Sequence, residues 1–506
     1  MPEFTTIAAV DLGSNSFHLQ VARVVGDQIY PLDSLRWPVR LGAGLTQDKR
    51  LEEEVQERAL QCLKHFGERL RGVDRGAVRA VGTNTLRVAK NAASFLRKAE
   101  AALGFPIEVV AGREEARLIY LGVSHELPAS KQRRLVVDIG GGSTECIIGR
   151  GHKPLKLESL YMGCVSYSLR YFENGMISKG AMKEAELAAR NELQPIVASH
   201  GQGNWEEAAG SSGTVRTIGE ALLLNGFAES DITPDGLDRL RSALIKAGDL
   251  NEVDLKGLKA DRLPILPGGL AILNAVLSEL KIEHLIIASG ALRQGILYDM
   301  LGRIQHHDMR DVTAAQFMQR YHVDGSQARR VSRLAIELYR QFAAESGEAE
   351  EQMLRQIDWA AKLHEIGISV AYSGYNRHSA YIIQNADMPG FSKMEQRSLA
   401  LLILAHRRSL KKILDQLQGG IDWHAVIALR LSALFCRRRA DVALPEFSAR
   451  AKGKSFRLKL DQRWLERNPL TVATLREEVE AWDAVGFELE IKALDQIETA
   501  DLGSPD

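Results

Sequence analysis

The sequence contains the stretch Ala9-Val10-Asp11-Leu12-Gly13-Ser14-Asn15-Ser16-Phe17-His18, and later the related stretch Val136-Val137-Asp138-Ile139-Gly140-Gly141-Gly142-Ser143-Thr144-Glu145. In each, an apolar run ends in Asp, turns through glycine and small hydroxyl residues, and resumes as an apolar run. This pattern predicts a strand, a tight loop and a second strand. Such loops let backbone N–H groups gather around an anion. Two copies indicate two related lobes that face one polyphosphate-like ligand.

The segments around these stretches are also repeated. Gly82-Thr83-Asn84-Thr85-Leu86-Arg87 follows an apolar strand and opens a helix, and Ser289-Gly290-Ala291-Leu292-Arg293 does the same. Helical periodicity covers 51–70, before the first of these segments, and an acidic helix start lies between them at Glu114-Glu115. We interpret 208–213 as a further small-residue loop. The fold class is therefore α/β, with duplicated lobes over 1–124 and 125–303.

The character of the sequence changes near residue 304. We predict a helical domain over 304–442 and a small α+β domain over 443–506. The 506 residues have a formal net charge of zero and only four scattered cysteines. The zero net charge argues against nucleic-acid binding driven by overall charge, and the scattered cysteines argue against structural zinc and a disulfide framework. We expect a protein of the reducing cytoplasm with no transmembrane segment, and peripheral contact with the inner membrane face is an alternative.

Hydrolysis of a phosphoanhydride requires a divalent metal, donors for the oxyanions and a base that orients water. Asp138 and Glu145 bracket the second turn and could share one magnesium ion, which prefers one or two carboxylates plus water and phosphate oxygens. The first copy has Asp11 but carries His18 in place of Glu145, so the second copy is the metal half. Glu115 is the candidate base. Surface acids on a glycine hairpin, and simple helix capping by Glu115, are the alternatives.

Small, hydroxyl and basic residues of the same segments are candidates for holding phosphate oxygens. For Arg87 and Arg293, one from each lobe, exposed arginines at helix starts are the alternative. The full set of phosphate-binding candidates is Asp11, Ser14, Asn15, Ser16, Thr83, Arg87, Gly140, Gly141, Gly142, Ser143, Ser212, Gly213, Thr214, Gly290 and Arg293.

The helical region contains His364-Glu365, His378 and His406. This pattern resembles a His-Asp metal phosphohydrolase with Glu in place of Asp. The helix expected over 325–341 lacks a histidine and 424–438 lacks an aspartate, so we predict a descendant without a working two-metal site. Basic clusters at 406–412, 437–439 and 450–459 are either solvated faces or a track for a long polyanion.

These motifs, in this order, resemble the exopolyphosphatase and guanosine pentaphosphate phosphohydrolase family, most closely its long bacterial exopolyphosphatase form. They include Gly112-Arg113-Glu114-Glu115-Ala116-Arg117, Met162-Gly163-Cys164-Val165 and Gly210-Ser211-Ser212-Gly213-Thr214. The resemblance implies two actin-like, sugar-kinase-type lobes, a helical His-Asp-like domain and a small C-terminal domain. It also implies Glu115 as the catalytic glutamate, Asp138 and Glu145 as magnesium ligands, and a homodimer with a basic polyphosphate channel. Stimulation by a monovalent cation such as K⁺ is a further expectation.

We therefore predict a processive, magnesium-dependent exopolyphosphatase without a specific nucleic-acid partner. One alternative keeps the chemistry and takes guanosine pentaphosphate, with guanosine tetraphosphate as a further partner and a link to the stringent response. Another is a regulator that senses nucleotide or polyphosphate with little turnover. A sugar or acid kinase fits less well, because a water-directing glutamate suits hydrolysis.

Overall fold

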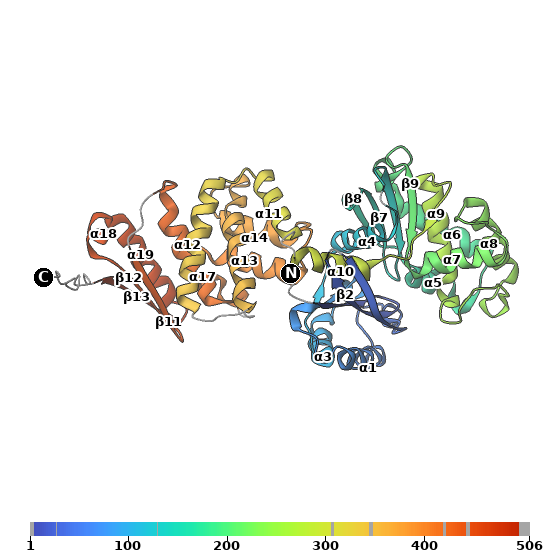
Figure 1. The fold of residues 1–506 in the computed structure, drawn as a ribbon, viewed down its shortest axis with the longest axis horizontal. Coiled ribbons are helices and arrows are strands. Elements are labelled where there is room, and N and C mark those ends of the chain that lie inside the picture. Colours follow the sequence, from blue (N-terminus) through green and yellow to red (C-terminus); the bar gives the residue numbers. More distant parts are fainter. Residues whose placement is uncertain are drawn as a thin grey trace. The chain divides into compact units, whose positions relative to one another are not determined.

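The computed structural model describes residues 5–26, 28–128, 130–304, 308–343, 348–417, 421–441 and 446–494 (Figure 1). The chain forms two compact units. Unit 1 comprises Met1–Met309 together with Pro389–Lys393, and unit 2 comprises Arg310–Met388 and Met394–Asp506. The short segment Pro389–Lys393 thus belongs to unit 1, although unit 2 residues flank it in sequence.

The first lobe of unit 1 is built on a five-stranded mixed sheet. Its strands are β1 (Thr6–Leu12), β2 (Phe17–Val25), β3 (Gln28–Trp37), β4 (Val78–Gly82) and β5 (Ile107–Val109), in the order β3-β2-β1-β4-β5. β1 pairs antiparallel with β2 and parallel with β4. Helices α1 (Glu53–Arg69), α2 (Asn84–Val88) and α3 (Ala92–Leu103) complete the lobe, and α1 buries the apolar stripe that the sequence predicted.

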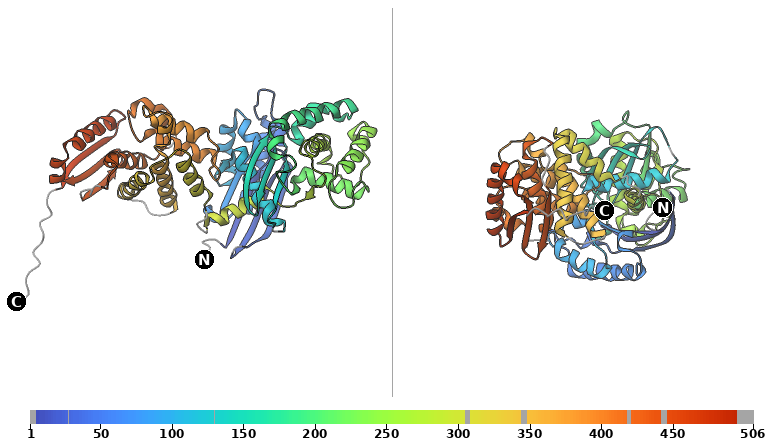
Figure 2. Two further views of the ribbon diagram at one scale, coloured as in Figure 1. Left: turned by 90° about the horizontal axis from the view of Figure 1, so that it is seen from above. Right: turned by 60° about the vertical axis from the view of Figure 1, so that its left-hand side comes forward.

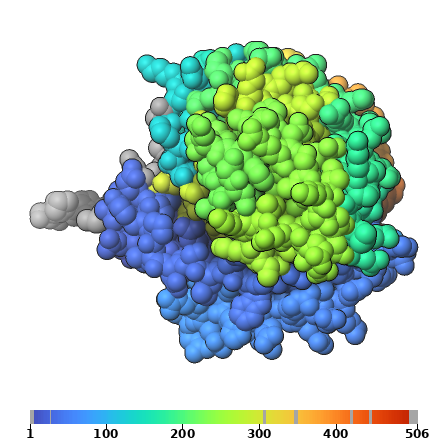
Figure 3. Space-filling model, turned by 90° about the vertical axis from the view of Figure 1, so that its right-hand side faces the viewer, coloured from blue at the N-terminus to red at the C-terminus, as the bar shows by residue number. Residues whose placement is uncertain are grey.

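The second lobe repeats this topology. β6 (Arg133–Ile139), β7 (Thr144–Arg150), β8 (Lys153–Leu160), β9 (Glu207–Ser211) and β10 (Ile286–Ile287) lie in the order β10-β9-β6-β7-β8. Taken in chain order, these strands occupy the places of β1 to β5, so the duplication inferred from the two hairpin motifs is confirmed by the topology. The second predicted repeat, 82–87 with 289–293, is wrong, because 82–87 follows β4 whereas 289–293 follows β10, the counterpart of β5. The helices are α5 (Cys164–Tyr171), α6 (Lys179–His200), α7 (Ser212–Leu224), α8 (Pro234–Ala247) and α9 (Leu266–Leu280). Figure 3 shows this lobe, in green, against the first, in blue.

Two helices join the lobes. α4 (Gly112–Glu126) and α10 (Leu292–Ile304) pack together, and their apolar residues share one core with residues of β1 and β6. Glycines make this close approach possible. A Cβ on Gly295 would lie 1.7 Å from the Leu118 carbonyl oxygen, and a Cβ on Gly122 would lie 2.2 Å from that of Ala291. Since backbone atoms cannot yield to such contacts, a side chain at either position would separate the two helices.

Unit 2 begins with a helical region and ends with a small sheet (Figure 2). The helices are α11 (Met309–Arg320), α12 (Gly325–Ala343), α13 (Glu348–Leu363), α14 (Tyr375–Asn385), α15 (Lys393–Ala405), α16 (Leu414–Leu417) and α17 (Trp423–Phe435). The sheet has the order β11-β12-β13, made by β11 (Phe447–Lys452), β12 (Ser455–Asp461) and β13 (Glu488–Leu494), and it carries α18 (Gln462–Arg467) and α19 (Pro469–Asp483). The helical and α+β characters expected from the sequence are both present. The expected boundary at 442 and 443 and the segment 495–506 lie outside the described residues.

Two expectations require correction. The segment 208–213 is not a loop, because its first residues form the buried strand β9, which pairs with β6, and α7 begins at Ser212. The window Leu263–Leu280 has the length and mean hydropathy, 1.5, of a membrane span, although the sequence suggested no such stretch; 72% of it is buried. It contains α9, which is apolar on all sides because α5, α6, α7 and α8 cover it.

Candidate active site

The turns of the two hairpins face each other in unit 1. A Cβ on Gly141, in the β6–β7 turn, would lie 2.9 Å from Ser14 Cβ and 3.3 Å from the Asn15 nitrogen, both in the β1–β2 turn. A Cβ on Gly142 would lie 2.5 Å from Asn84 Oδ1. The glycines are therefore required because the lobes approach closely here, as the repeated motif predicted.

Both turns have carbonyl oxygens that are already hydrogen-bonded. The N–H groups of Arg40 and Gly42 donate to the carbonyls of Asn15 and Ser14, at 2.7 Å each. In the second lobe, Cys164 and Val165 at the start of α5 donate to the carbonyls of Gly140 and Gly141, at 2.9 and 3.0 Å. Because unpaired carbonyl oxygens would repel a phosphate, these bonds make each turn a better anion site.

The acidic candidates lie at paired positions of the hairpin strands. Asp138 is opposite Glu145, and Asp11 is opposite His18, whose Nδ1 is 3.6 Å from an Asp11 carboxylate oxygen. Ser211 Oγ donates to Asp138, and Ser159 Oγ donates to Glu145 Oε1 at 2.8 Å.

Each of two carboxylates keeps one unused oxygen. Within the described chain, Glu145 Oε2 and Asp11 Oδ1 are buried and have no hydrogen-bond partner. Unsatisfied buried oxygens are costly, so this arrangement is suited to a bound cation.

Glu115 occupies the first turn of α4 and is buried. Arg87 Nη1 donates to Glu115 Oε2 at 2.6 Å and to the Val110 carbonyl at 3.1 Å. Arg87, which the sequence suggested for phosphate, thus holds the carboxylate of Glu115 in this structure.

The carboxyl groups raise one another's pKa. Burial, together with the negative charges of Glu115 and Asp11, raises the pKa of Asp138 to about 6, although the hydrogen bond from Ser211 opposes this shift. Burial, Glu115 and Asp138 raise the pKa of Glu145 well above its usual range. Burial also raises the pKa of Glu115, although Arg87 opposes it. Such mutual effects require proximity, so Glu115, Asp138, Glu145 and Asp11 lie close to one another.

The donor set fits magnesium. Among the described residues no group of three or more His, Cys, Asp or Glu side chains has the arrangement of a metal centre. Magnesium does not require one, because it takes one or two carboxylates and fills its octahedron with water and phosphate oxygens. Two observations support a cation here. Glu145 Oε2 has no hydrogen-bond partner in the described chain, and the pKa values of Glu145 and Asp138 are raised.

Besides Arg87, a cluster of four arginines lies beside this group, and three of them were not singled out in the sequence. Arg293 is half-buried, its buried Nε has no hydrogen-bond partner among the described residues, and its side chain interacts electrostatically with Asp11, Arg216 and Arg36. Burial, Arg36 and Arg216 lower the pKa of Arg262, whose guanidinium would meet a Cβ on Gly213 at 2.5 Å. Arg36 donates to Asp261 at 2.5 Å and to Ser16 Oγ at 3.5 Å. Mutually repelling guanidinium groups suit a ligand with several phosphates.

Three of these arginines, Arg36, Arg216 and Arg262, were missed by motif spacing because they come from remote segments. Of these three, only Arg216 had a local signal, since it follows the Gly210–Thr214 motif by two residues.

The other phosphate-binding candidates differ in what surrounds them. Ser14, Ser16, Thr83 and Ser143 are buried around the turns, and Ser14 Oγ accepts a bond from Thr85 at 2.8 Å. Ser212 starts α7 with a positive φ of 92°. Two candidates are engaged elsewhere: Thr214 Oγ1 donates to Cys164 Sγ at 3.3 Å, and the Gly290 N–H donates to Glu126 Oε2 at 3.0 Å. Glu126 is at the far end of α4 from Glu115, so the structure does not bring Gly290 to the turns.

A buried ionic network fixes the start of α4. Glu114, next to Glu115, accepts bonds from Arg117 and from the Gly390 N–H at 2.8 Å. Arg117 also binds Asp299 of α10, at 2.5 Å, and Asp299 binds Arg79 and Arg303. The segment Pro389–Lys393 is therefore bound to Glu114, the residue that precedes the candidate base Glu115.

Comparison with known proteins agrees with this geometry. The model of the Ppx/GppA phosphatase family matches residues 20–304, and that of Ppx/GppA phosphatase domain III matches 309–479. The chain belongs to the Ppx/GppA phosphatase family. A crystal structure of an exopolyphosphatase from Cytophaga hutchinsonii is similar, with 25% identity, a TM-score of 0.54, and coverage of 59% of this chain and 98% of that one. The Aquifex aeolicus PPX-GPPA enzyme shares the fold, with 24% identity, a TM-score of 0.50, and coverage of 58% and 99%.

Membership of the family makes the chain one of a group of phosphatases. The comparisons support phosphatase activity at the level of the family. The solved relatives correspond to little more than half of this chain, and the family model for domain III extends the relationship into unit 2.

Proposed function

We propose that this chain is a magnesium-dependent exopolyphosphatase that releases the terminal orthophosphate of inorganic polyphosphate. The observation that carries the proposal is the joint burial of Glu115, Asp138 and Glu145 beneath two opposed phosphate-binding turns. The similarity to an exopolyphosphatase supports the choice of substrate.

The phosphate-binding parts have separate tasks. The turn N–H groups and Arg293 would hold the oxygens of the terminal phosphate, and Arg36, Arg216 and Arg262 would hold the following phosphates. Asp138 and Glu145 would bind magnesium. The ion, when bound, would draw negative charge from the scissile phosphate and its leaving oxygen.

Glu115 would act as the base. Burial raises its pKa, which makes its carboxylate a better proton acceptor, while the bond from Arg87 fixes its orientation. As the oxygen of water bonds to the terminal phosphorus, its proton passes to Glu115. The bond from phosphorus to the bridging oxygen breaks, and the shortened polyphosphate leaves with that electron pair.

The direct test is orthophosphate release from long-chain polyphosphate by the wild type and by Glu115→Ala. We expect the variant to fold and bind polyphosphate but to lose 10²- to 10⁴-fold in turnover, the usual contribution of a positioned base. Turnover close to that of the wild type would exclude this role for Glu115. Orthophosphate release by the wild type also separates an enzyme from a sensor with little turnover.

Guanosine pentaphosphate is the rival substrate, because it ends in the same phosphoanhydride. Comparing kcat/KM for the two substrates separates them. A higher value for long polyphosphate supports the proposal, and a higher value for the nucleotide replaces it. Potassium stimulation, processivity and a homodimer stay predictions from the resemblance, and a cytoplasmic location stays a prediction from the scattered cysteines.

A further inference from the structure

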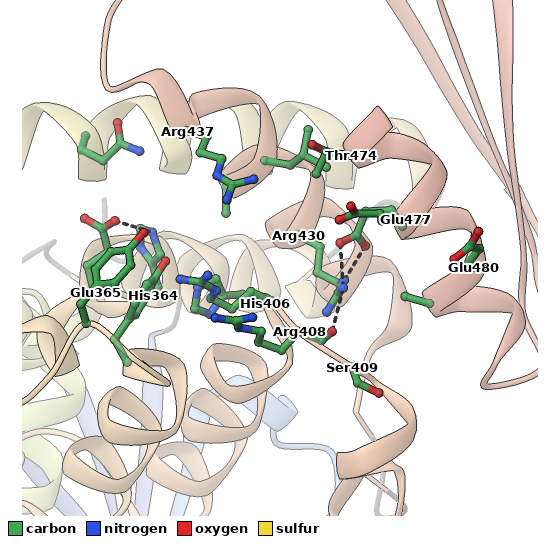
Figure 4. Close-up of a pocket in the computed structure, with 18 of the residues that line it drawn as sticks. His364, Glu365, His406, Arg408, Ser409, Arg430, Arg437, Thr474, Glu477 and Glu480 are labelled. Carbon is green, nitrogen blue, oxygen red and sulfur yellow. Dashed lines mark hydrogen bonds and ion pairs between the residues drawn. The ribbon is translucent and has the colours of Figure 1, made fainter. Parts of the chain in front are cut away.

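Unit 2 contains a cavity of about 540 Å³ between its helical region and α19. His364, Glu365 and His406 lie at one end of it (Figure 4). The Tyr375 ring contacts that of His406, and Arg407 lies over the Tyr375 ring. Glu477 and Glu480 of α19 line the other end. The volume is within the usual range for sites that bind small organic ligands, ~300–1,000 Å³.

One buried arginine organises the walls of this cavity. Arg430 of α17 donates to both carboxylate oxygens of Glu478, at 2.7 and 2.8 Å. It also donates to the carbonyls of Ala405 and Arg408, at 2.7 and 3.1 Å. These four bonds tie α19 to the end of α15 and fix the backbone that carries His406, Arg407 and Arg408. The cavity is therefore a built part of unit 2.

The histidine end offers acceptors for hydrogen bonds. Nδ1 of His364 lies 2.7 Å from the Ala361 carbonyl, and Nδ1 of His406 lies 2.5 Å from the Ile403 carbonyl. Each Nδ1 therefore carries the proton, which leaves Nε2 as an acceptor. His406 is 2% exposed, and its Nε2 has no partner among the described residues. Burial, His364 and Arg407 lower the pKa of His406, so the ring is neutral and can accept an N–H or O–H group from a ligand.

The surrounding charges favour an anion over a metal ion. Glu365, the acid of the His-Glu pair, accepts a bond from Arg439 at 2.5 Å. Arg407 lies over the Tyr375 ring, with 4.4 Å from its guanidinium carbon to the ring centre, which orients the guanidinium. In the described part of unit 2, no carboxylate lies within ion-pair distance of Arg407, Arg408 or Arg437. Guanidinium groups in this setting repel a divalent cation and match a phosphate.

We propose that this cavity binds a nucleoside phosphate, independently of the chemistry in unit 1. The phosphate would lie against Arg407, Arg408 and Arg437. A sugar hydroxyl would donate to His406 Nε2. The amino group of adenine, or the amino group and N1–H of guanine, would face Glu477 and Glu480, because the acidic end repels further phosphate. The basic and acidic ends together select a ligand that carries phosphate on one side and hydrogen-bond donors on the other.

The test is titration calorimetry of the full-length protein with AMP and GMP. Hydrogen exchange with the same ligands locates the site. We expect slower exchange in 361–375 and 403–410, and at least tenfold weaker binding in the double variant R407A/R437A. Arg438→Ala is the matched control, since Arg438 is exposed, adjacent in sequence and outside the cavity lining. Arg407→Lys, which keeps the charge but not the guanidinium fork, should bind with intermediate affinity.

Several outcomes would overturn the proposal. One is an affinity for AMP and GMP that is unchanged in R407A/R437A. Another is an affinity that falls as much in R438A as in R407A/R437A. A third is protection from exchange that is confined to unit 1. If orthophosphate binds as tightly as AMP, the proposal that the ligand carries a nucleoside is wrong. Protection of 361–375 and 403–410 by Mn²⁺ alone would instead assign a metal site.

Discussion

Asp138→Asn should stabilise the protein while it abolishes metal-dependent turnover. Folding places the Asp138 carboxylate in a buried pocket beside Glu115 and Asp11, where its pKa rises from its ordinary value of 3.8 to about 6. At ~1.4 kcal/mol per pKa unit, ionised Asp138 costs about 3 kcal/mol of folding free energy at pH 8. Asparagine removes the charge and can still accept the bond from Ser211.

The raised pKa of Asp138 determines how the stabilising effect of Asp138→Asn changes with pH. The pKa of Asp138 is higher in the folded than in the unfolded state, so its stabilising contribution is complete below about pH 4 and is lost as the pH rises through about 6. The advantage of Asp138→Asn should therefore be about 3 kcal/mol at pH 8 and below about 1 kcal/mol at pH 4. Urea unfolding in EDTA, followed by tryptophan fluorescence, measures both values.

Asp299→Asn is the opposite control. Burial alone would raise the pKa of Asp299, but Arg117, Arg303 and Arg79 outweigh it and lower that pKa. Asparagine removes the negative charge that three guanidinium groups share, so Arg79, Arg117 and Arg303 each lose one ionic partner, and the protein should be destabilised by ~3–5 kcal/mol. If both variants lose stability at pH 8, or if the effect of Asp138→Asn does not change with pH, the account of a crowded acidic pocket is wrong.

Three further predictions concern the same pocket. In the wild type, kcat/KM at fixed Mg²⁺ should fall about tenfold per pH unit below about pH 6, as Asp138 becomes protonated; a flat profile down to pH 5 would contradict the metal role. Gly163→Ala should lower phosphate affinity at least tenfold in a binding titration, because its Cβ would lie 2.4 Å from the Gly141 carbonyl and would displace the turn; unchanged affinity would show that the turn is not the anion site. Glu114→Gln should reduce kcat more than it changes KM, because it weakens the bonds that hold the start of α4, and an equal kcat would limit Glu114 to stability.

The sequence predicted the two hairpins because their signal is local. A glycine turn between apolar runs determines its own geometry, and the position of Asp138 opposite Glu145 follows from strand pairing. Glu115 was identified by its place at a helix start. The arginine cluster could not be predicted in the same way, because Arg36, Arg216 and Arg262 meet only after the lobes have folded.

The errors also have physical causes. Small residues suggested a loop over 208–213, whereas residues as far as Ser211 form β9, a buried strand beside β6, and α7 begins at Ser212. The likeness of 289–293 to 82–87 suggested a phosphate role for Gly290, but 289–293 follows β10, the counterpart of β5, whereas 82–87 follows β4. Gly290 serves helix packing, since a Cβ there would lie 2.6 Å from the Gly122 carbonyl oxygen. A short sequence likeness between the two lobes therefore does not ensure that the segments occupy equivalent places in the fold.

Crystals of Glu115→Gln grown with Mn²⁺ and triphosphate would test the central claim most directly, through the anomalous scattering of manganese. The account predicts one strong peak within ~2.3 Å of a carboxylate oxygen of Asp138 or Glu145, with the terminal phosphate between the turns at Ser14 and Gly141. A peak elsewhere, or triphosphate bound away from both turns, would contradict it.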